Sequence, residues 1–351
     1  MPKTAQRDTF LDYLRTIAMI EVLIVHVIYW GDFLDERFEV IQSFLVFEMP
    51  LFFFVAGATS TMKPIPSWQK YVTTRWRKIL IPYSIFAIIT ITTSFLFCHA
   101  YHLPQEWPVP KLILSWFILN GHQLCYIEYV PYSTWFLMFY LIIILFIPFL
   151  QKAKTTKPLL TGIILFIGVI AGDFLKLDKI QNTLTYTLWV YLGMFHKEIR
   201  TALCETKYRK HAIDLITGLA TILLILFMYG ISLNMQDNKF PPNTIFFIYG
   251  IIMVTFILLQ EKAINRFFNW IRRYRIGRTI ITCYGQHSLI VCFYHAYIFN
   301  FTIPFARNII PIHNAADEVL KCMICFTLSF VGATILACMF QWTNKLAISR
   351  K

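Results

Sequence analysis

The sequence has few charged residues. Asp, Glu, Lys and Arg make up 15% of its 351 residues, whereas about 25% is typical of soluble globular domains. Hydrophobic residues reach 57%, and the mean hydropathy is +0.58. This composition excludes a water-soluble globule, a disordered chain and a small secreted domain held by disulfides. It predicts an all-α polytopic membrane protein, in which a bundle of helices crosses the bilayer.

Acidic residues are the scarcer of the two charged kinds. The chain holds 19 Asp and Glu against 32 Lys and Arg, which gives a formal net charge of +13. In a soluble protein such an excess would suggest a nucleic-acid partner. In a membrane protein, basic residues gather in the cytoplasmic loops, so we expect the lipid bilayer as a partner and no nucleic acid.

The sequence also lacks the signals of export, metal binding and repeats. Its first apolar run starts after Asp12, contains Glu21 and His26, and has no small-residue cleavage site behind it, so we expect no cleavable signal peptide. Cys322 and Cys325 form a CxxC without a second pair, inside an apolar run. No repeat of fixed period is present. We therefore expect neither a metal site nor a permanently bound cofactor.

A membrane span needs about 20 mainly apolar residues, and the sequence offers ten such runs. They lie at about 14–30, 40–60, 79–98, 134–150, 159–176, 182–196, 212–233, 243–260, 279–301 and 318–342. The fifth and sixth are predicted to form a tight hairpin, and the short segment 111–119 is predicted to be an interfacial helix. We expect a single membrane domain over residues 1–351, with no appended soluble domain.

The basic residues orient this arrangement. With the N-terminus inside, 25 of the 32 Lys and Arg fall on the cytoplasmic side. The other seven are Arg37, Lys111, Lys176, Lys179, Lys239, Arg307 and Lys321. This bias predicts ten spans with both termini cytoplasmic, in a cell (inner or plasma) membrane.

Ionisable side chains inside a span are costly, so they are functional candidates. Arg15 and His26 lie eleven residues apart in the first span, which places them within about 20° of one helix face and about 16 Å apart along the axis. They could bind the two ends of one elongated ligand. His295 lies deep in the ninth span. The alternatives are that His26 is a buried histidine hydrogen-bonded to a neighbouring span, and that Arg15 extends to a lipid phosphate.

Two further residues are candidates for binding a substrate. Glu48 is expected in the middle of the second span beside Pro50, where the helix is prone to kink, and its carboxyl either pairs with a cation or is protonated. Trp135 belongs to a set of aromatic residues in and next to the loop 99–133. This set is either an interfacial aromatic belt or a surface on which sugar rings stack.

Arg75 and Lys78 form a basic pair at the start of the third span. They lie three residues apart, so they share a helix face. The pair is either a positive-inside anchor or a clamp for phosphate groups.

Five segments carry a family resemblance. In chain order they read LDYLRTIAMIEVLIVH (11–26), MPLFFFVAG (49–57), RWRKILIPY (75–83), STWFLMFYL (133–141) and YGQHSLIVCFYH (284–295). Together with the ten predicted spans they resemble the membrane acyltransferase 3 family, whose members O-acylate sugars and glycans at the inner membrane. The resemblance implies transfer from cytoplasmic acyl-coenzyme A, usually acetyl-coenzyme A, to a hydroxyl of a carbohydrate or glycolipid.

The resemblance also implies roles for particular residues: Arg15 and His26, Arg75 and, near the end, His295. Where the family usually has a second Arg in the basic pair, this chain has Lys78, which keeps the charge but not the bidentate fork. A His, with a reference pKa of about 6.5, is suited to take the acceptor proton. We expect His26 to act as this base or as a nucleophile that carries the acyl group, with Arg15, Arg75 and Lys78 near the phosphates of the donor.

A transporter or flippase for glycans or lipids is the rival function. It would also use intramembrane Glu and His residues, but no inverted repeat supports it. A purely structural subunit would leave Glu21, Glu48, His26 and His295 without a role. The identity of the acceptor and the oligomeric state do not follow from the sequence.

Overall fold

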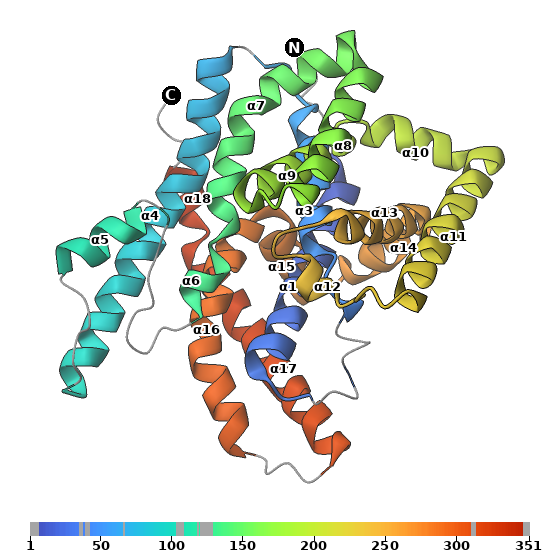
Figure 1. Cartoon of the computed structure of the whole chain (residues 1–351). Coiled ribbons are helices and arrows are strands. Elements are labelled where there is room, and N and C mark those ends of the chain that lie inside the picture. Colours follow the sequence, from blue (N-terminus) through green and yellow to red (C-terminus); the bar gives the residue numbers. More distant parts are fainter. Residues whose placement is uncertain are drawn as a thin grey trace. The chain divides into compact units, whose positions relative to one another are not determined.

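The structure is a computed structural model that describes residues 7–34, 38, 43–65, 67–102, 109–117, 119, 129–309 and 314–346. Helices account for most of this part of the chain (Figure 1). The extended pairing within it is an isolated bridge between Lys239 and Pro242. The predicted all-α class is therefore confirmed for the described residues.

A helix lies at each of the ten predicted spans. In chain order these helices are α1 (Thr9–Gly31), α3 (Glu48–Ser60), α4 (Trp68–Ala100), α7 (Phe136–Thr156), α8 (Pro158–Phe174), α9 (Asp178–Gly193), α11 (Thr206–Met228), α13 (Thr244–Leu259), α16 (Ser288–Ile309) and α17 (Ala315–Phe340). The predicted interfacial segment is helix α5 (Val109–Phe117). The hairpin between α8 and α9 turns at Lys176, whose φ is 52°.

Fewer of these helices meet the requirements of a membrane span. Among the described residues, five are long and apolar enough: α4, α7, α11, α16 and the segment Ala315–Asn344. A sixth is reached if α13 and α14 (Glu261–Ile271), which are bent by 64°, count as one span. Helix α1 carries several charges, and α3, α8 and α9 have 13, 17 and 16 residues. The count of ten spans stays a prediction.

The second predicted span begins later than expected. Helix α3 starts at Glu48, so Glu48 is its first residue and Pro50 lies in the first turn. A proline there interrupts no helical hydrogen bond, because the first N–H groups of a helix have no partner within it. The expectations of a mid-span Glu48 and of a kink at Pro50 are both wrong.

The helices pack as two compact units that alternate along the chain. The first unit comprises Met1–Glu21, Phe38–Trp68 and Ile142–Ile281, and the second comprises Val22–Arg37, Gln69–Leu141 and Thr282–Lys351. Each is described below by itself. Helix α1 contributes its first half to one unit and its second half to the other.

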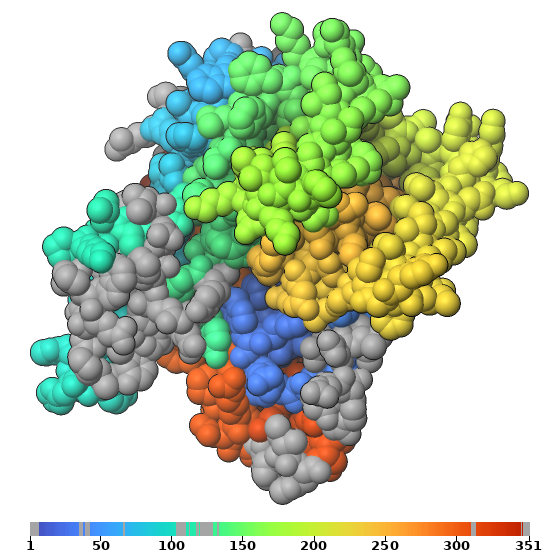
Figure 2. Space-filling model, in the orientation of Figure 1, coloured from blue at the N-terminus to red at the C-terminus, as the bar shows by residue number. Residues whose placement is uncertain are grey.

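In the first unit, α3 and α9 meet backbone to backbone. A Cβ atom on Gly57 would lie 1.9 Å from the carbonyl oxygen of Val190, and one on Gly193 would lie 1.9 Å from that of Phe54. Glycine is therefore required at both places, as in the close helix contacts of membrane proteins. Helix α11, which is coloured yellow in Figure 2, packs on α13 and exposes most of its apolar side chains.

In the second unit, α16 packs along α17 (Figure 1). Just before α16, a short π-helix, η2 (Ile281–Gln286), presents Tyr284, which donates a hydrogen bond of 3.0 Å to the carbonyl of Phe330. On another side, Phe86 of α4 stacks on Phe293 with the ring centroids 5.2 Å apart. These contacts fix the backbone of α16, which carries His295.

Candidate active site

His26 of α1 and His295 of α16 meet in the second unit. Nδ1 of His26 lies 2.8 Å from Nε2 of His295, and the two ring planes differ by 7°. His295 is completely buried, whereas His26 is partly exposed. The structure thus brings together two of the residues that the sequence singled out, although 269 positions separate them.

The contacts of His295 select one arrangement of protons. Its Nδ1 lies 3.2 Å from the carbonyl oxygen of Val291, and because a carbonyl only accepts, this nitrogen carries the proton. In a neutral ring Nε2 of His295 is then the acceptor, so Nδ1 of His26 donates to it. A neutral His26 with its proton on Nδ1 has its basic lone pair on Nε2. The pair therefore presents Nε2 of His26 as the basic atom.

Trp30 covers the ring of His26. It lies one helical turn further along α1 and stacks on His26 at 3.8 Å between centroids, with the planes 6° apart. Tyr129 stacks on Trp30 at 5.3 Å, and Phe299 meets His26 and Trp30 edge-on. These rings hold the plane of His26 in place. Sequence reasoning missed Trp30, although its i+4 spacing from His26 predicts the contact.

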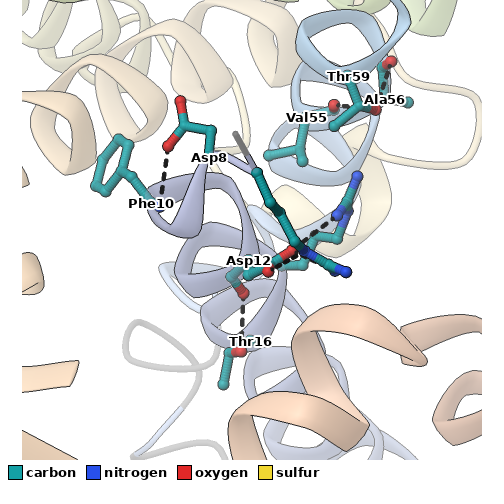
Figure 3. Close-up of polar contacts among 9 residues, drawn as sticks. Asp8, Phe10, Asp12, Thr16, Val55, Ala56 and Thr59 are labelled. Carbon is teal, nitrogen blue, oxygen red and sulfur yellow. Dashed lines mark hydrogen bonds and ion pairs between the residues drawn. The ribbon is translucent and has the colours of Figure 1, made fainter. Parts of the chain in front are cut away.

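Arg15 lies in the first unit, where an acidic neighbour holds it. Its Nη1 donates to Oδ1 of Asp12 at 3.2 Å, and the same carboxylate accepts bonds of 2.6 and 2.9 Å from Arg7. Figure 3 shows Asp12 on the early turns of α1, with its backbone carbonyl accepting from Thr16. About a quarter of the Arg15 side chain is exposed (23%). Asp12 therefore orients a guanidinium that still reaches the surface.

Arg75 and Lys78 lie on α4 in the second unit, the unit that also holds the histidine pair. The guanidinium carbon of Arg75 lies 5.3 Å from the ring centroid of Tyr71, and Lys78 is exposed. Between them, Trp76 donates a hydrogen bond of 3.2 Å to the carbonyl of Leu141. This bond anchors the basic stretch of α4 to α7, so both cations are presented by a fixed helix.

Glu48 and Glu21 belong to a separate polar cluster in the first unit. Glu48 forms a salt bridge with Lys239, and Glu21 accepts a hydrogen bond of 3.1 Å from the N–H of Phe47. Glu21 also interacts electrostatically with both Glu48 and Lys239. Exposure of the three charged residues is only 3–4%. The sequence analysis placed Lys239 in an outer loop and did not identify it as the partner of Glu48, because nothing in its local sequence points to Glu48. The acceptor-binding role of Glu48 stays a prediction.

Trp135 lies between α6 (Val130–Ser133) and α7, where its ring is edge-on to Phe139 with centroids 6.0 Å apart. Residues 103–108, 118 and 120–128 of the neighbouring loop lie outside the described residues, so the sugar-stacking surface stays a prediction. In the part of the chain that the structure describes, no group of three His, Cys, Asp or Glu residues could hold a metal ion. Cys322 and Cys325 are free thiols there.

A charge network outside the spans ties the start of α1 to α10 (His196–Cys204) and α14. Arg200 donates to Asp8 at 2.6 Å and to Glu261 at 2.9 Å. Burial lowers the pKa of Arg200, but the two carboxylates outweigh it and hold the pKa above its usual value. Burial lowers the pKa of the adjacent His196, so this ring is neutral at pH 7. The network fixes the first residue of α14.

A family model described as an acyltransferase domain matches residues 8–341. The match includes the ten helices from α1 to α17 named above, and with them both histidines and the basic pair. No curated protein and no solved structure matches the chain.

Proposed function

The chain belongs to the acyltransferase family that its match over residues 8–341 defines, and we propose that it moves an acetyl group from cytoplasmic acetyl-coenzyme A to a hydroxyl of a cell-envelope glycan or glycolipid. One observation carries this proposal: a partly exposed His26 is held by His295 with Nε2 as its basic atom. Attack of a hydroxyl on a thioester needs a base of near-neutral pKa in this position.

The chemical step uses Nε2 of His26. This nitrogen takes the proton of the acceptor hydroxyl while the hydroxyl oxygen bonds to the thioester carbon. The carbon–sulfur bond then breaks, and the proton passes from His26 to the leaving thiolate, which gives an ester and free coenzyme A. In the covalent alternative, Nε2 attacks first and carries the acetyl group to the acceptor. A burst of one labelled coenzyme A per protein molecule in the absence of acceptor distinguishes the covalent route.

Other residues hold the two substrates. Arg75 and Lys78 bind the phosphates of the donor, because charge-assisted contacts are the strong ones for phosphate. The supporting role of Arg15, which belongs to the first unit, stays a prediction from the sequence. Trp135 binds the acceptor by stacking on a sugar ring. The carboxyl of Glu48 is buried in its salt bridge with Lys239, so its predicted contact with the acceptor is not part of this proposal. The fixed position of the basic pair on α4 supports its assignment to the donor.

The test is transfer of label. Purified protein in lipid is incubated with radiolabelled acetyl-coenzyme A and a panel of envelope glycans, and the glycan fraction is counted. We expect label in a glycan with wild type and with His211→Ala, a control at an exposed position on α11, but not with His26→Ala. Glycan that crosses the bilayer without gaining label would instead identify a transporter.

The proposal includes an orientation, with both termini cytoplasmic. It rests on the distribution of Lys and Arg. Cys204, which is exposed in the loop 197–211, is a native reporter of this loop. In intact cells that carry single-cysteine variants, an impermeant thiol reagent should leave Cys204 unmodified and should modify a cysteine introduced in the loop 99–133. The reverse labelling pattern would overturn the orientation.

A further inference from the structure

Helix α14 follows α13 directly but points in a different direction. Helix α13 contains no charged residue, whereas α14 begins with Glu261 and Lys262 and includes Arg266. The two helices are bent by 64° at the junction. Charged side chains are excluded from the hydrocarbon region by several kcal/mol each. Such a change in composition is expected where a span ends at the membrane surface, and the bend directs α14 away from the axis of α13.

One side of α14 is anchored to the protein. Ile264, Phe268 and Ile271 pack against Tyr13 and Ile17 of α1. The Phe268 ring stacks on Tyr13 at 4.8 Å, and the Tyr13 hydroxyl donates a hydrogen bond of 2.8 Å to Asn269. Arg200 holds Glu261 at the start of the helix. The orientation of the opposite side is therefore set by the fold.

The opposite side has two adjacent sectors. At 100° per residue, Lys262 and Arg266 lie about 40° apart, and Phe267 and Trp270 form the next sector, about 60° apart. All four are exposed, with 54% of Phe267 and 52% of Trp270 accessible. The pattern continues beyond α14 and into α15 (Arg275–Ile280). The exposed residues there include Arg273, Tyr274, Arg275, Ile276 and Arg278.

We propose that this surface, formed by Lys262, Arg266, Phe267, Trp270 and the exposed residues 273–276 and 278, binds anionic phospholipid headgroups of the leaflet in which α13 ends. Aromatic rings favour the boundary between headgroups and acyl chains, and cations beside them meet the lipid phosphates. Zwitterionic lipid satisfies the aromatic sector alone, whereas the row of cations is complementary to a net negative headgroup. Continuity with α13 places the surface at the depth of the headgroups rather than in open water.

The experiment uses full-length protein in vesicles that contain brominated phosphatidylglycerol or brominated phosphatidylcholine, and it measures quenching of tryptophan emission. Wild type should be quenched more by the anionic lipid. Trp270→Phe should remove this excess, because it removes the reporter at the surface. Lys262→Gln with Arg266→Gln keeps Trp270 and should lower the enrichment of anionic lipid about fivefold per charge removed.

A matched control removes two charges elsewhere in the same unit. Lys207→Gln with Arg209→Gln changes two exposed residues of α11 and should leave the excess quenching intact. Equal quenching by the two lipids in wild type, or an equal loss in the control, would overturn the proposal. Loss of affinity for acetyl-coenzyme A in Lys262→Gln with Arg266→Gln, at unchanged lipid preference, would identify the surface as a donor site instead.

Discussion

The histidine pair of the second unit and the Glu21–Glu48–Lys239 cluster of the first both place polar groups inside an apolar protein, but they differ in charge and in exposure. Both join α1 to a distant segment through polar groups in an apolar protein. The pair consists of two imidazole rings, one of which is partly exposed. The cluster sets two carboxyl groups against one ammonium group, and all three side chains are buried. Our proposal gives the chemical step to the histidine pair, whereas the buried salt bridge of the cluster predicts a role in stability.

The two sites share helix α1. Glu21 and His26 lie five residues apart, which places them about 140° apart around the helix axis. One helix therefore presents a carboxylate to the first unit and an imidazole to the second. Variants of the histidine pair should therefore change the activity and not the stability, and variants of the cluster should change the stability and not the activity.

The largest effect is expected at the reacting atom. His26→Ala should lower the rate of acetyl transfer by at least about 10² and up to about 10⁴, the usual contribution of a general base, while thermal unfolding stays close to wild type. Label transfer and unfolding are measured on the same preparation. Transfer above about a tenth of wild type is incompatible with an essential base.

The cluster should show the opposite behaviour. Lys239→Met leaves Glu48 buried without its cation and should cost about 3–5 kcal/mol of stability, whereas Glu48→Gln with Lys239→Met should recover most of this loss. Thermal or denaturant unfolding in lipid checks both variants. If Glu48 also binds the acceptor, the double variant should be stable but have a raised KM. A Lys239→Met variant as stable as wild type would refute the structural role.

His295 should behave as a positioning residue. His295→Ala removes the acceptor for Nδ1 of His26 and should lower kcat by about one to two decades, with KM nearly unchanged. His295→Gln, which keeps an acceptor oxygen, should retain more activity. Steady-state kinetics of both variants provide the measurement. Equal losses in Ala and Gln would mean that His295 acts through packing rather than through the hydrogen bond.

The basic pair should affect donor affinity alone. Arg75→Ala should weaken acetyl-coenzyme A binding by about 1.5–3 kcal/mol, or one to two decades, and less so at raised salt. Lys78→Arg should preserve or improve binding, because the guanidinium fork suits phosphate. His26→Ala should bind the donor as wild type does. Unchanged affinity in Arg75→Ala at low and high salt would leave the pair as a topology anchor.

The smallest effect concerns packing in the first unit. Gly57→Ala forces α3 away from Val190 of α9 and should cost about 1–3 kcal/mol. Gly218 of α11 is the matched control, since a Cβ there meets nothing within 4 Å. Gly218→Ala should be neutral or stabilising by up to about 1 kcal/mol. The free energy of unfolding is measured for the two variants in parallel. Equal stability of the two would contradict the close backbone contact between α3 and α9.

Much of the helical architecture could be predicted from sequence, because long apolar runs flanked by Lys and Arg allow few alternatives. The two histidines stand out in the sequence by their chemistry, and the structure brings them together, whereas the donor-binding role of the basic pair stays a prediction. The errors are local. Pro50 marks the start of α3 and no kink, since proline fits the first turn of a helix.

Partnerships between distant residues could not be predicted. The bond between His26 and His295 and the salt bridge between Glu48 and Lys239 join residues 269 and 191 positions apart. Hydrophobic periodicity says which face of a helix is buried, but it carries no information on which helix faces it. The tautomer of His26 follows from the second partner of His295, and that partner is known only from the fold.

The salt bridge between Glu48 and Lys239 also has a consequence for how the chain is made. During synthesis Glu21 and Glu48 leave the ribosome first, and 191 residues separate Glu48 from its cation. At about 5–20 residues per second, that interval lasts about 10–40 s. Until Lys239 emerges, a carboxylate in lipid without its cation is strongly unfavourable, so we expect Glu48 to stay outside the hydrocarbon region during this interval. The first unit closes only when a late segment of the nascent chain returns to an early one.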